Sequence, residues 1–110
     1  MSPARGEIYL VAPPPGKDPR RARAVVIVSR QTLCDSKADK LICAPINTKS
    51  DGRSTEVPIG IEQGLKHNSV VNCDQLVLIE KARLTNYLGV LSTAMLVDLR
   101  RALRIALDIA

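Results

Sequence analysis

The chain has 110 residues, a usual length for one domain, and 45% of them are hydrophobic, which is enough for a packed core. Lys and Arg number 16 against 11 Asp and Glu, so the net charge of +5 favours an anionic partner. The odd number of cysteines argues against a disulfide framework, and without a Cys/His cluster no metal site is expected. No signal-peptide core or membrane-spanning run is present, so we expect a cytoplasmic protein with no membrane partner.

Short β-rich runs dominate the chain up to residue 91. They predict strands at residues 6–11, 24–29, 41–46, 55–59, 69–73, 76–79 and 87–91. The run 24–29 is almost continuously β-branched, which is typical of a central strand buried on both faces. Pro45 predicts either the end of its strand or a bulge. Because no helices alternate with these strands, the sheet is expected to be antiparallel.

The stretches between the predicted strands have the composition of loops and turns. Residues 12–22 are rich in proline and then in charge, which predicts a long loop. Residues 30–40 predict a turn with a short helix, and residues 81–84 one helical turn. Residues 47–54 and 60–68 predict a turn and a loop.

A single long helix is predicted at the C-terminus, over residues 92–110. Ser92 is a good N-cap, because its hydroxyl can accept a hydrogen bond from a free backbone N–H of the first turn. One apolar stripe follows helical spacing through Met95, Leu99, Ala102, Leu103, Ala106 and Leu107. The predicted fold over residues 1–110 is therefore one mainly β domain, a bent antiparallel sheet or small barrel with this helix packed on it.

Three stretches carry side chains suited to chemistry. The loop 16–23 contains Lys17, Asp18, Arg20, Arg21 and Arg23, and a guanidinium at the entry of a buried strand suits bidentate phosphate contact. The alternative is an ordinary solvated basic loop.

The second stretch follows the strand 41–46, where Asn47, Thr48 and Lys49 can contact a phosphate or a base edge. The alternative is turn chemistry, in which the same side chains bond to nearby backbone, and the frequency of such turns favours it.

The third stretch is residues 70–75, with Asn72, Asp74 and Gln75 among apolar residues. A carboxylate in apolar surroundings must be paired, and Arg23 is one candidate partner. A structural salt bridge is as reasonable an interpretation as a catalytic role. The lone His67 is interpreted as an exposed loop residue, so acid–base chemistry without a histidine pair is expected.

Taken together and in this order, these segments resemble the MazF/PemK family of toxin endoribonucleases. The opening Arg-Gly-Glu-Ile-Tyr at residues 5–9 is similar to the family's start, and the glycine–acidic–arginine loop matches residues 16–23. Further similar segments are residues 44–48, 55–58, 64–75 and 81–84. The resemblance covers nearly the whole chain.

The resemblance implies an SH3-like barrel of the CcdB/MazF type that works as a homodimer without a cofactor. It implies metal-independent, sequence-specific cleavage of single-stranded RNA, often mRNA, in which the ribose 2′-hydroxyl attacks the adjacent phosphate. An acidic antitoxin is the implied partner, and its tail would cover the RNA groove.

The resemblance also implies roles for individual residues. Arg23 is the implied main catalytic residue, as general acid or phosphoryl stabiliser. The family's hydroxyl falls on Asn47 by strict alignment and on Thr48 after a slip of one residue, and we favour Thr48 because it keeps the hydroxyl. The implied RNA-binding residues are Lys17, Asp18, Arg20, Arg21, Lys49, Asn72, Asp74 and Gln75.

Two other functions remain open at this point. One is a CcdB-like toxin that inhibits DNA gyrase through its C-terminal helix without catalysis. The other is a basic RNA-binding module that does not cleave.

Overall fold

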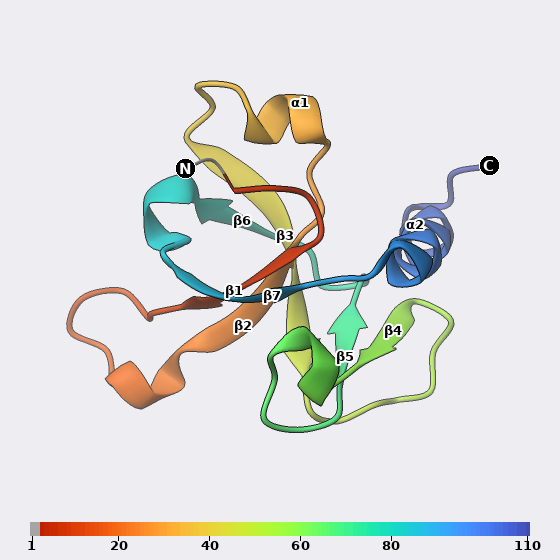
Figure 1. The fold of residues 1–110 in the computed structure, drawn as a ribbon, viewed down its shortest axis with the longest axis horizontal. Coiled ribbons are helices and arrows are strands. Elements are labelled where there is room, and N and C mark those ends of the chain that lie inside the picture. The colour runs from red at the N-terminus through yellow and green to blue at the C-terminus, as the bar shows by residue number, and fades with distance from the viewer. Residues whose placement is uncertain (1–2) are drawn as a thin grey trace.

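A computed structural model describes residues 3–110 of the chain (Figure 1). Met1 and Ser2, which the predicted domain also includes, lie outside the described residues. The strands are β1 (Glu7–Val11), β2 (Arg23–Ile27), β3 (Lys40–Asn47), β4 (Glu56–Ile59), β5 (Ser69–Asn72), β6 (Val77–Glu80) and β7 (Asn86–Val90). The helical elements are α1 (Gln31–Cys34), α2 (Thr93–Leu107) and the 3₁₀ turns η1 (Pro19–Arg21), η2 (Ile61–Gln63) and η3 (Lys81–Arg83).

The strands form one strongly curled antiparallel sheet in the order β4-β5-β3-β2-β1-β7, with β6 also paired to β3. Every pairing between these strands is antiparallel, as the absence of alternating helices predicts. The sheet curls into an open half-barrel, and α2 covers the side where β4 and β5 lie (Figure 1). The mainly β fold with a C-terminal helix is therefore confirmed. Among the described residues, no helix has the length and apolar character needed to cross a membrane.

The long strand β3 bends across both halves of the sheet. One edge pairs with β2, through Val25 opposite Pro45. The other edge pairs first with β6, up to Cys43, and then with β5, from Ile46 onward. Pro45 lies between these two segments, where a residue without an N–H takes no bond away from either ladder. The strand predicted at residues 41–46 thus continues past Pro45 and ends one residue later than predicted, at Asn47.

Each face of the sheet carries its own core. On one face, Ile8, Val26 and Leu99 are fully buried in a cluster that includes β4, β5 and α2. On the other face, Ile27 and Leu41 are fully buried in a cluster that also includes a residue of α1 and Leu84, which follows η3. We call this cluster the second core. Side chains alternate between faces along a strand, so β2 contributes to both cores. The predicted burial of this central strand on both faces is confirmed.

The helix α2 begins where the sequence predicts and ends earlier. The Ser92 hydroxyl accepts a hydrogen bond from the Met95 N–H, so Ser92 is the N-cap. Leu99 and Ala102 are buried against the sheet. Leu107 is 53% exposed, whereas Leu103 and Ala106 pack against the core, so the place of Leu107 in the predicted apolar stripe is wrong. The helix stops at Leu107, where Asp108 adopts the left-handed conformation with φ of 54°.

Two glycines bring the far ends of the curled sheet together. Gly64, just after η2, has φ of 92°, and a Cβ there would lie 2.0 Å from the Leu88 carbonyl oxygen. A Cβ on Gly89 in β7 would lie 2.1 Å from the Gln63 carbonyl oxygen. Backbone therefore meets backbone, which no larger residue permits. This contact joins the segment after β4 to β7, although those strands lie at opposite edges of the sheet.

The hydroxyl of Tyr9 is placed between the second core and a carboxylate. Tyr9 is 6% exposed and donates a hydrogen bond to Glu7 Oε1 at 3.1 Å. Its ring packs edge-to-face on Tyr87, with centroids 5.8 Å apart. Burial, and next the hydrogen bond to Glu7, raise the pKa of Tyr9 to about 12.

The packing of α2 gives a direct test of the fold. Replacing Leu99 by Ala should lower the free energy of unfolding by about 2–5 kcal/mol, because it leaves a cavity under the helix. Leu107→Ala on the same helix should change it by less than about 0.5 kcal/mol. Urea denaturation followed by circular dichroism measures both. Equal losses for the two variants would contradict the described packing of α2.

The raised pKa of Tyr9 predicts alkaline sensitivity. Because the folded-state pKa of about 12 lies above the ordinary value of 10.0, the Tyr9 contribution to stability is complete below pH 10 and is lost between these values. Tyr9→Phe should therefore lose less stability than the wild type over this interval. Urea midpoints measured across that pH range test this, and parallel curves for the two proteins would contradict it.

Candidate active site

An open groove of about 530 Å³ lies where the loop between β1 and β2 meets the end of β3. We call it the central groove. Its polar lining consists of Arg21, Arg23, Asn47, Gln75 and Arg83. Apolar residues from four strands and two prolines of the loop complete it: Val11, Pro13, Pro14, Val25, Pro45, Ile46, Val77 and Ile79.

The position of the central groove follows from the exchange of partners along β3. Beside Pro45, β6 has ended its pairing and β5 has just begun its own, so one edge of β3 is left open there. Gln75, which precedes β6, and Val77, its first residue, border that opening. The bend of β3 therefore creates the hollow.

Arg23 and Asn47 reach the same groove because of strand register. Val25 pairs with Pro45 at the end of the β2–β3 ladder, and Arg23 and Asn47 each lie two residues beyond that pair. Val11 pairs with Arg23 on the other side. These three residues of β1, β2 and β3 all line the groove.

The electrostatic character of the central groove is cationic. Three arginines line it, and no carboxylate is among its lining residues. Its apolar floor is the end of the second core, formed by Val11, Val25 and Ile79. A guanidinium above an apolar floor makes strong, directional bonds to phosphate oxygens, because few competing charges lie near it.

Arg83 is a groove residue that the sequence-based prediction missed. It lies in η3, is half-buried, and donates a hydrogen bond from Nη2 to the Ala12 carbonyl at 2.6 Å. The two residues are 71 positions apart in the chain. The only sequence signal was the pair of cations in the segment 81–84, and that pattern does not distinguish Arg83 from Lys81.

The basic loop divides between the groove and solvent. Arg21 and Arg23 line the central groove, whereas Lys17, Asp18 and Arg20 do not. Asp18 caps η1 by accepting from the Arg20 N–H and forms an ion pair with the Arg20 guanidinium at 3.0 Å. The Arg20 hydrogen bonds lower the pKa of Asp18. The local charge of Arg20 is therefore offset by its own loop.

The end of β3 separates the two residues weighed for the hydroxyl position. Asn47 is the last residue of the strand, is half-buried and lines the groove. Thr48 and Lys49 lie beyond the strand, are exposed and do not line it. The residue that shares the groove with Arg23 is therefore Asn47, which carries an amide, and not Thr48, which carries the hydroxyl.

Asp74 is paired, but not with Arg23. It accepts a hydrogen bond from the Thr55 hydroxyl at 2.6 Å and forms an ion pair with Arg53 at 3.6 Å. The Asn72 side chain accepts from the Asp74 N–H at 2.9 Å, as in a turn. The expected ion pair of Asp74 with Arg23 is therefore wrong, and Arg53 is the partner of Asp74. Asn72 and Asp74 shape the turn after β5 and leave Gln75 alone to reach the groove.

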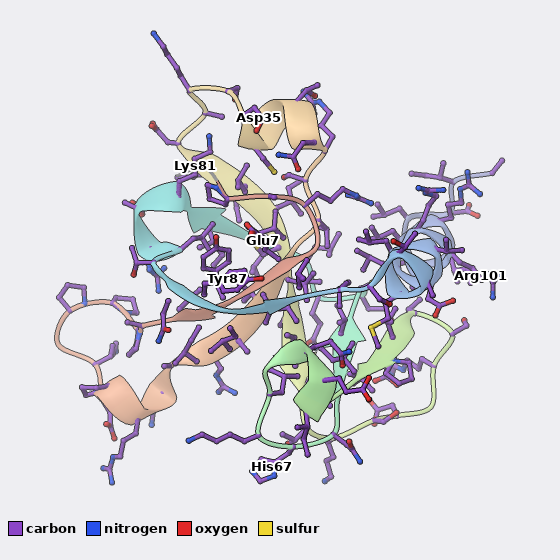
Figure 2. All side chains as sticks on the ribbon, in the orientation of Figure 1. Glu7, Asp35, His67, Lys81, Tyr87 and Arg101 are labelled. Atoms are coloured by element: carbon purple, nitrogen blue, oxygen red, sulfur yellow. The ribbon has the colours of Figure 1, made fainter. Side chains whose placement is uncertain are left out.

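The remaining titratable groups take no part in the central groove. His67 is exposed and extends outward from the loop after η2 (Figure 2). All three cysteines are free and buried. Burial raises the pKa of Cys43 to about 12 and that of Cys73 to about 11, so neither thiol is an activated nucleophile. Within residues 3–110, no three His, Cys, Asp or Glu side chains gather as metal ligands.

Comparisons with known proteins agree with this site and fold. A family model described as "PemK-like, MazF-like toxin of type II toxin-antitoxin system" matches residues 4–107. Endoribonuclease MazF3 of Mycobacterium tuberculosis is 33% identical over 89 residues, which covers 81% of this chain and 85% of that protein. The solved Mycobacterium tuberculosis toxin MazF-mt6 superposes with a TM-score of 0.81 at 29% identity, covering 94% of this chain and 98% of that one.

A mycobacterial endoribonuclease solved in complex with its cognate antitoxin gives a TM-score of 0.83 at 25% identity. That match covers 99% of this chain and 98% of the other. The family model and the MazF3 relative both extend over most of the sequence, and the solved structures share its curled sheet and helix. The chain therefore belongs to the PemK-like, MazF-like toxin family of type II toxin–antitoxin systems.

Proposed function

We propose that this chain is the toxin of a toxin–antitoxin pair and a sequence-specific endoribonuclease that cleaves single-stranded RNA, including mRNA, in the central groove. The observation that carries the proposal is that Arg23 and Asn47 line the same groove, together with two further arginines. The family and its endoribonuclease relative support the same activity.

The proposed reaction is attack by the ribose 2′-hydroxyl on the adjacent phosphorus. The bond from the 2′-oxygen to phosphorus forms and the bond from phosphorus to the 5′-oxygen breaks. Water accepts the 2′ proton and protonates the departing 5′-oxygen, which leaves a cyclic phosphate and a 5′-hydroxyl. Negative charge accumulates on the phosphoryl oxygens in the transition state, and fixed donors aimed at that charge lower the barrier.

Arg23 is proposed as the phosphoryl stabiliser. An arginine side chain stays protonated in proteins, so it suits charge stabilisation better than proton transfer. The Asn47 side-chain NH₂ can donate a second hydrogen bond to the same phosphoryl group. We place the polar partner at Asn47 in preference to Thr48, because Asn47 shares the groove with Arg23.

Metal-independent cleavage is proposed from the donor set of the groove. Mg²⁺ binds oxygen ligands, chiefly carboxylates together with substrate phosphates. The lining of the central groove supplies guanidinium groups and no carboxylate. Its fixed charges would thus repel a divalent cation and would themselves neutralise the phosphate.

Other residues are proposed to bind or attract RNA. Gln75 can read a base edge from the groove wall, whereas Asn72 and Asp74 would act through the turn that positions it. Lys17, Arg21 and Lys49 would attract RNA by long-range charge, whereas Asp18 and Arg20 would hold the loop through η1 and their ion pair.

An acidic antitoxin is the proposed protein partner, because a cationic groove suits an anionic chain. A relative of 25% identity has been solved in complex with its cognate antitoxin, which supports this. We further propose that the toxin acts as a homodimer in the cytoplasm, as members of its family are expected to do.

Arg23 gives the first test. Arg23→Ala should lower the cleavage rate of single-stranded RNA by about 100-fold or more, because it removes a donor to the developing charge. Arg30→Ala, an exposed arginine beyond the opposite end of β2, is the matched control and should cleave normally. Cleavage is followed in EDTA by gel, with mapping of cyclic-phosphate ends. If the wild-type protein binds RNA but does not cleave it, the chain is an RNA-binding module and not a nuclease. If it inhibits DNA gyrase, the CcdB-like alternative is supported.

Asn47 and Thr48 give the second test. Asn47→Ala should lower the cleavage rate by about 10-fold or more, since a hydrogen bond to a charged group is worth about 1.5–3 kcal/mol. Thr48→Ala should retain nearly the wild-type rate. Single-turnover rates at saturating enzyme compare the two variants. A large loss of cleavage rate in Thr48→Ala but not in Asn47→Ala would show that the Thr48 hydroxyl, and not Asn47, is the polar partner of Arg23.

A further inference from the structure

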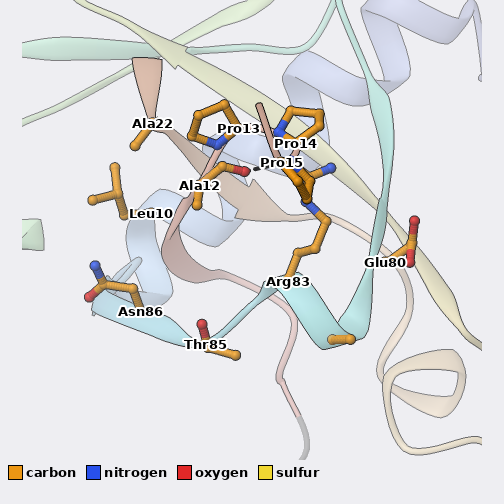
Figure 3. A pocket seen from close by; sticks show the side chains of 11 residues that line it. Leu10, Ala12, Pro13, Pro14, Pro15, Ala22, Glu80, Arg83, Thr85 and Asn86 are labelled. Atoms are coloured by element: carbon orange, nitrogen blue, oxygen red, sulfur yellow. Dashed lines mark hydrogen bonds between the residues drawn. The ribbon is translucent and has the colours of Figure 1, made fainter. Parts of the chain in front are cut away.

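A second pocket adjoins the central groove. It has a volume of about 630 Å³ and lies between the proline-rich loop, η3 and the start of β7 (Figure 3). We call it the flanking pocket. It shares Pro13, Pro14 and Arg83 with the central groove. The two hollows are therefore adjacent, and Arg83 lines both of them at their junction.

We propose that Arg83 binds an RNA phosphate at this junction and that the neighbouring nucleotide occupies the flanking pocket. This inference rests on the proposed function, since it extends the RNA path beyond the site of cleavage. It assigns Arg83 to substrate binding and gives the flanking pocket a nucleotide as its ligand.

Arg83 is already anchored in the geometry that phosphate binding requires. Its Nη2 donates to the Ala12 carbonyl at 2.6 Å, as the dashed line in Figure 3 marks. This bond uses one of the five N–H donors of the guanidinium. The side chain is half-buried, unlike the exposed Arg21 and Arg23. Little further rotamer entropy is lost when a phosphate binds to a side chain held in this way.

The lining of the flanking pocket suits a base more than a second phosphate. Pro13, Pro14 and Pro15 form an apolar wall, and the side chains of Thr85 and Asn86 lie across from it (Figure 3). Leu10, the strand partner of Asn86, lies beside Asn86. An amide can form paired hydrogen bonds with a base edge, and a flat apolar wall accommodates a base ring. The phosphate would remain at Arg83.

Glu80 distinguishes RNA from an acidic peptide as the occupant. This carboxylate lines the flanking pocket and would repel the acidic side chains of an antitoxin segment. The exocyclic amino group of a base can instead donate a hydrogen bond to it. The charges of this pocket therefore favour a nucleotide.

Lys81 provides a matched control in the same turn. Its Nζ donates to the Ser36 carbonyl at 2.6 Å, so Lys81 also joins η3 to a distant loop. Lys81 lines neither the central groove nor the flanking pocket. Replacing either cation by Met removes one charge and one bond to a carbonyl, but only Arg83 would lose a phosphate contact.

The experiment measures binding of a fluorescent, non-cleavable 2′-O-methyl RNA of about ten nucleotides by anisotropy. Affinity is measured between about 50 and 200 mM salt, and the slope of log K against log salt counts phosphate contacts. Arg83→Met should weaken binding and reduce the slope by about 0.7. Arg83→Lys should retain the slope, and Lys81→Met should behave as wild type. Asn86→Leu should weaken binding without changing the slope.

Four outcomes overturn the inference. One is a wild-type slope for Arg83→Met, and another is an equal loss for Lys81→Met. The third is loss of slope in Arg83→Lys, which would indicate a structural role. The fourth is a defect of Arg83→Met confined to binding of a synthetic acidic peptide. Uncleaved natural RNA with an Arg83-dependent slope would refute the proposed function alone, whereas cleavage without Arg83 dependence would refute this inference alone.

Discussion

The bend of β3 at Pro45 is the constraint from which the site follows. One strand has to pair with β6 before the bend and with β5 after it, and it keeps β2 on its other edge up to the bend, from Cys43 to Pro45. Buried backbone groups need partners, so an exchange of strands is tolerated where a residue has no N–H to satisfy. The resulting break in the ladder opens the central groove and fixes which side chains face it.

The chemistry available in that groove is governed by the scarcity of proton-transfer groups. No histidine or carboxylate lines it, so the proposed reaction would depend on charge placed in advance and not on an acid–base pair. Within the basic loop, Asp18 forms an ion pair with Arg20, whereas Arg21 and Arg23 line the groove.

Local patterns predicted most of the fold, because they report backbone preferences and burial. The β-branched run of β2 and the cap at Ser92 are of this kind, and both are confirmed. The errors concern tertiary placement. Nothing in the sequence shows that Arg53 and not Arg23 reaches Asp74, or that Leu107 is exposed. Arg83 was missed for the same reason, since its partner Ala12 is distant in the chain.

The contact of Gly64 with Gly89 has a consequence for the order of folding. The residues that line the central groove end at Arg83, but the curled sheet that supports them is joined edge to edge only once Gly89 is in place. Contacts between distant segments form late, because loop closure costs entropy before it is repaid. A ribosome-bound chain that stops short of β7 would carry the groove residues without a closed scaffold. A closed scaffold for the groove would therefore form only after β7 has been synthesised.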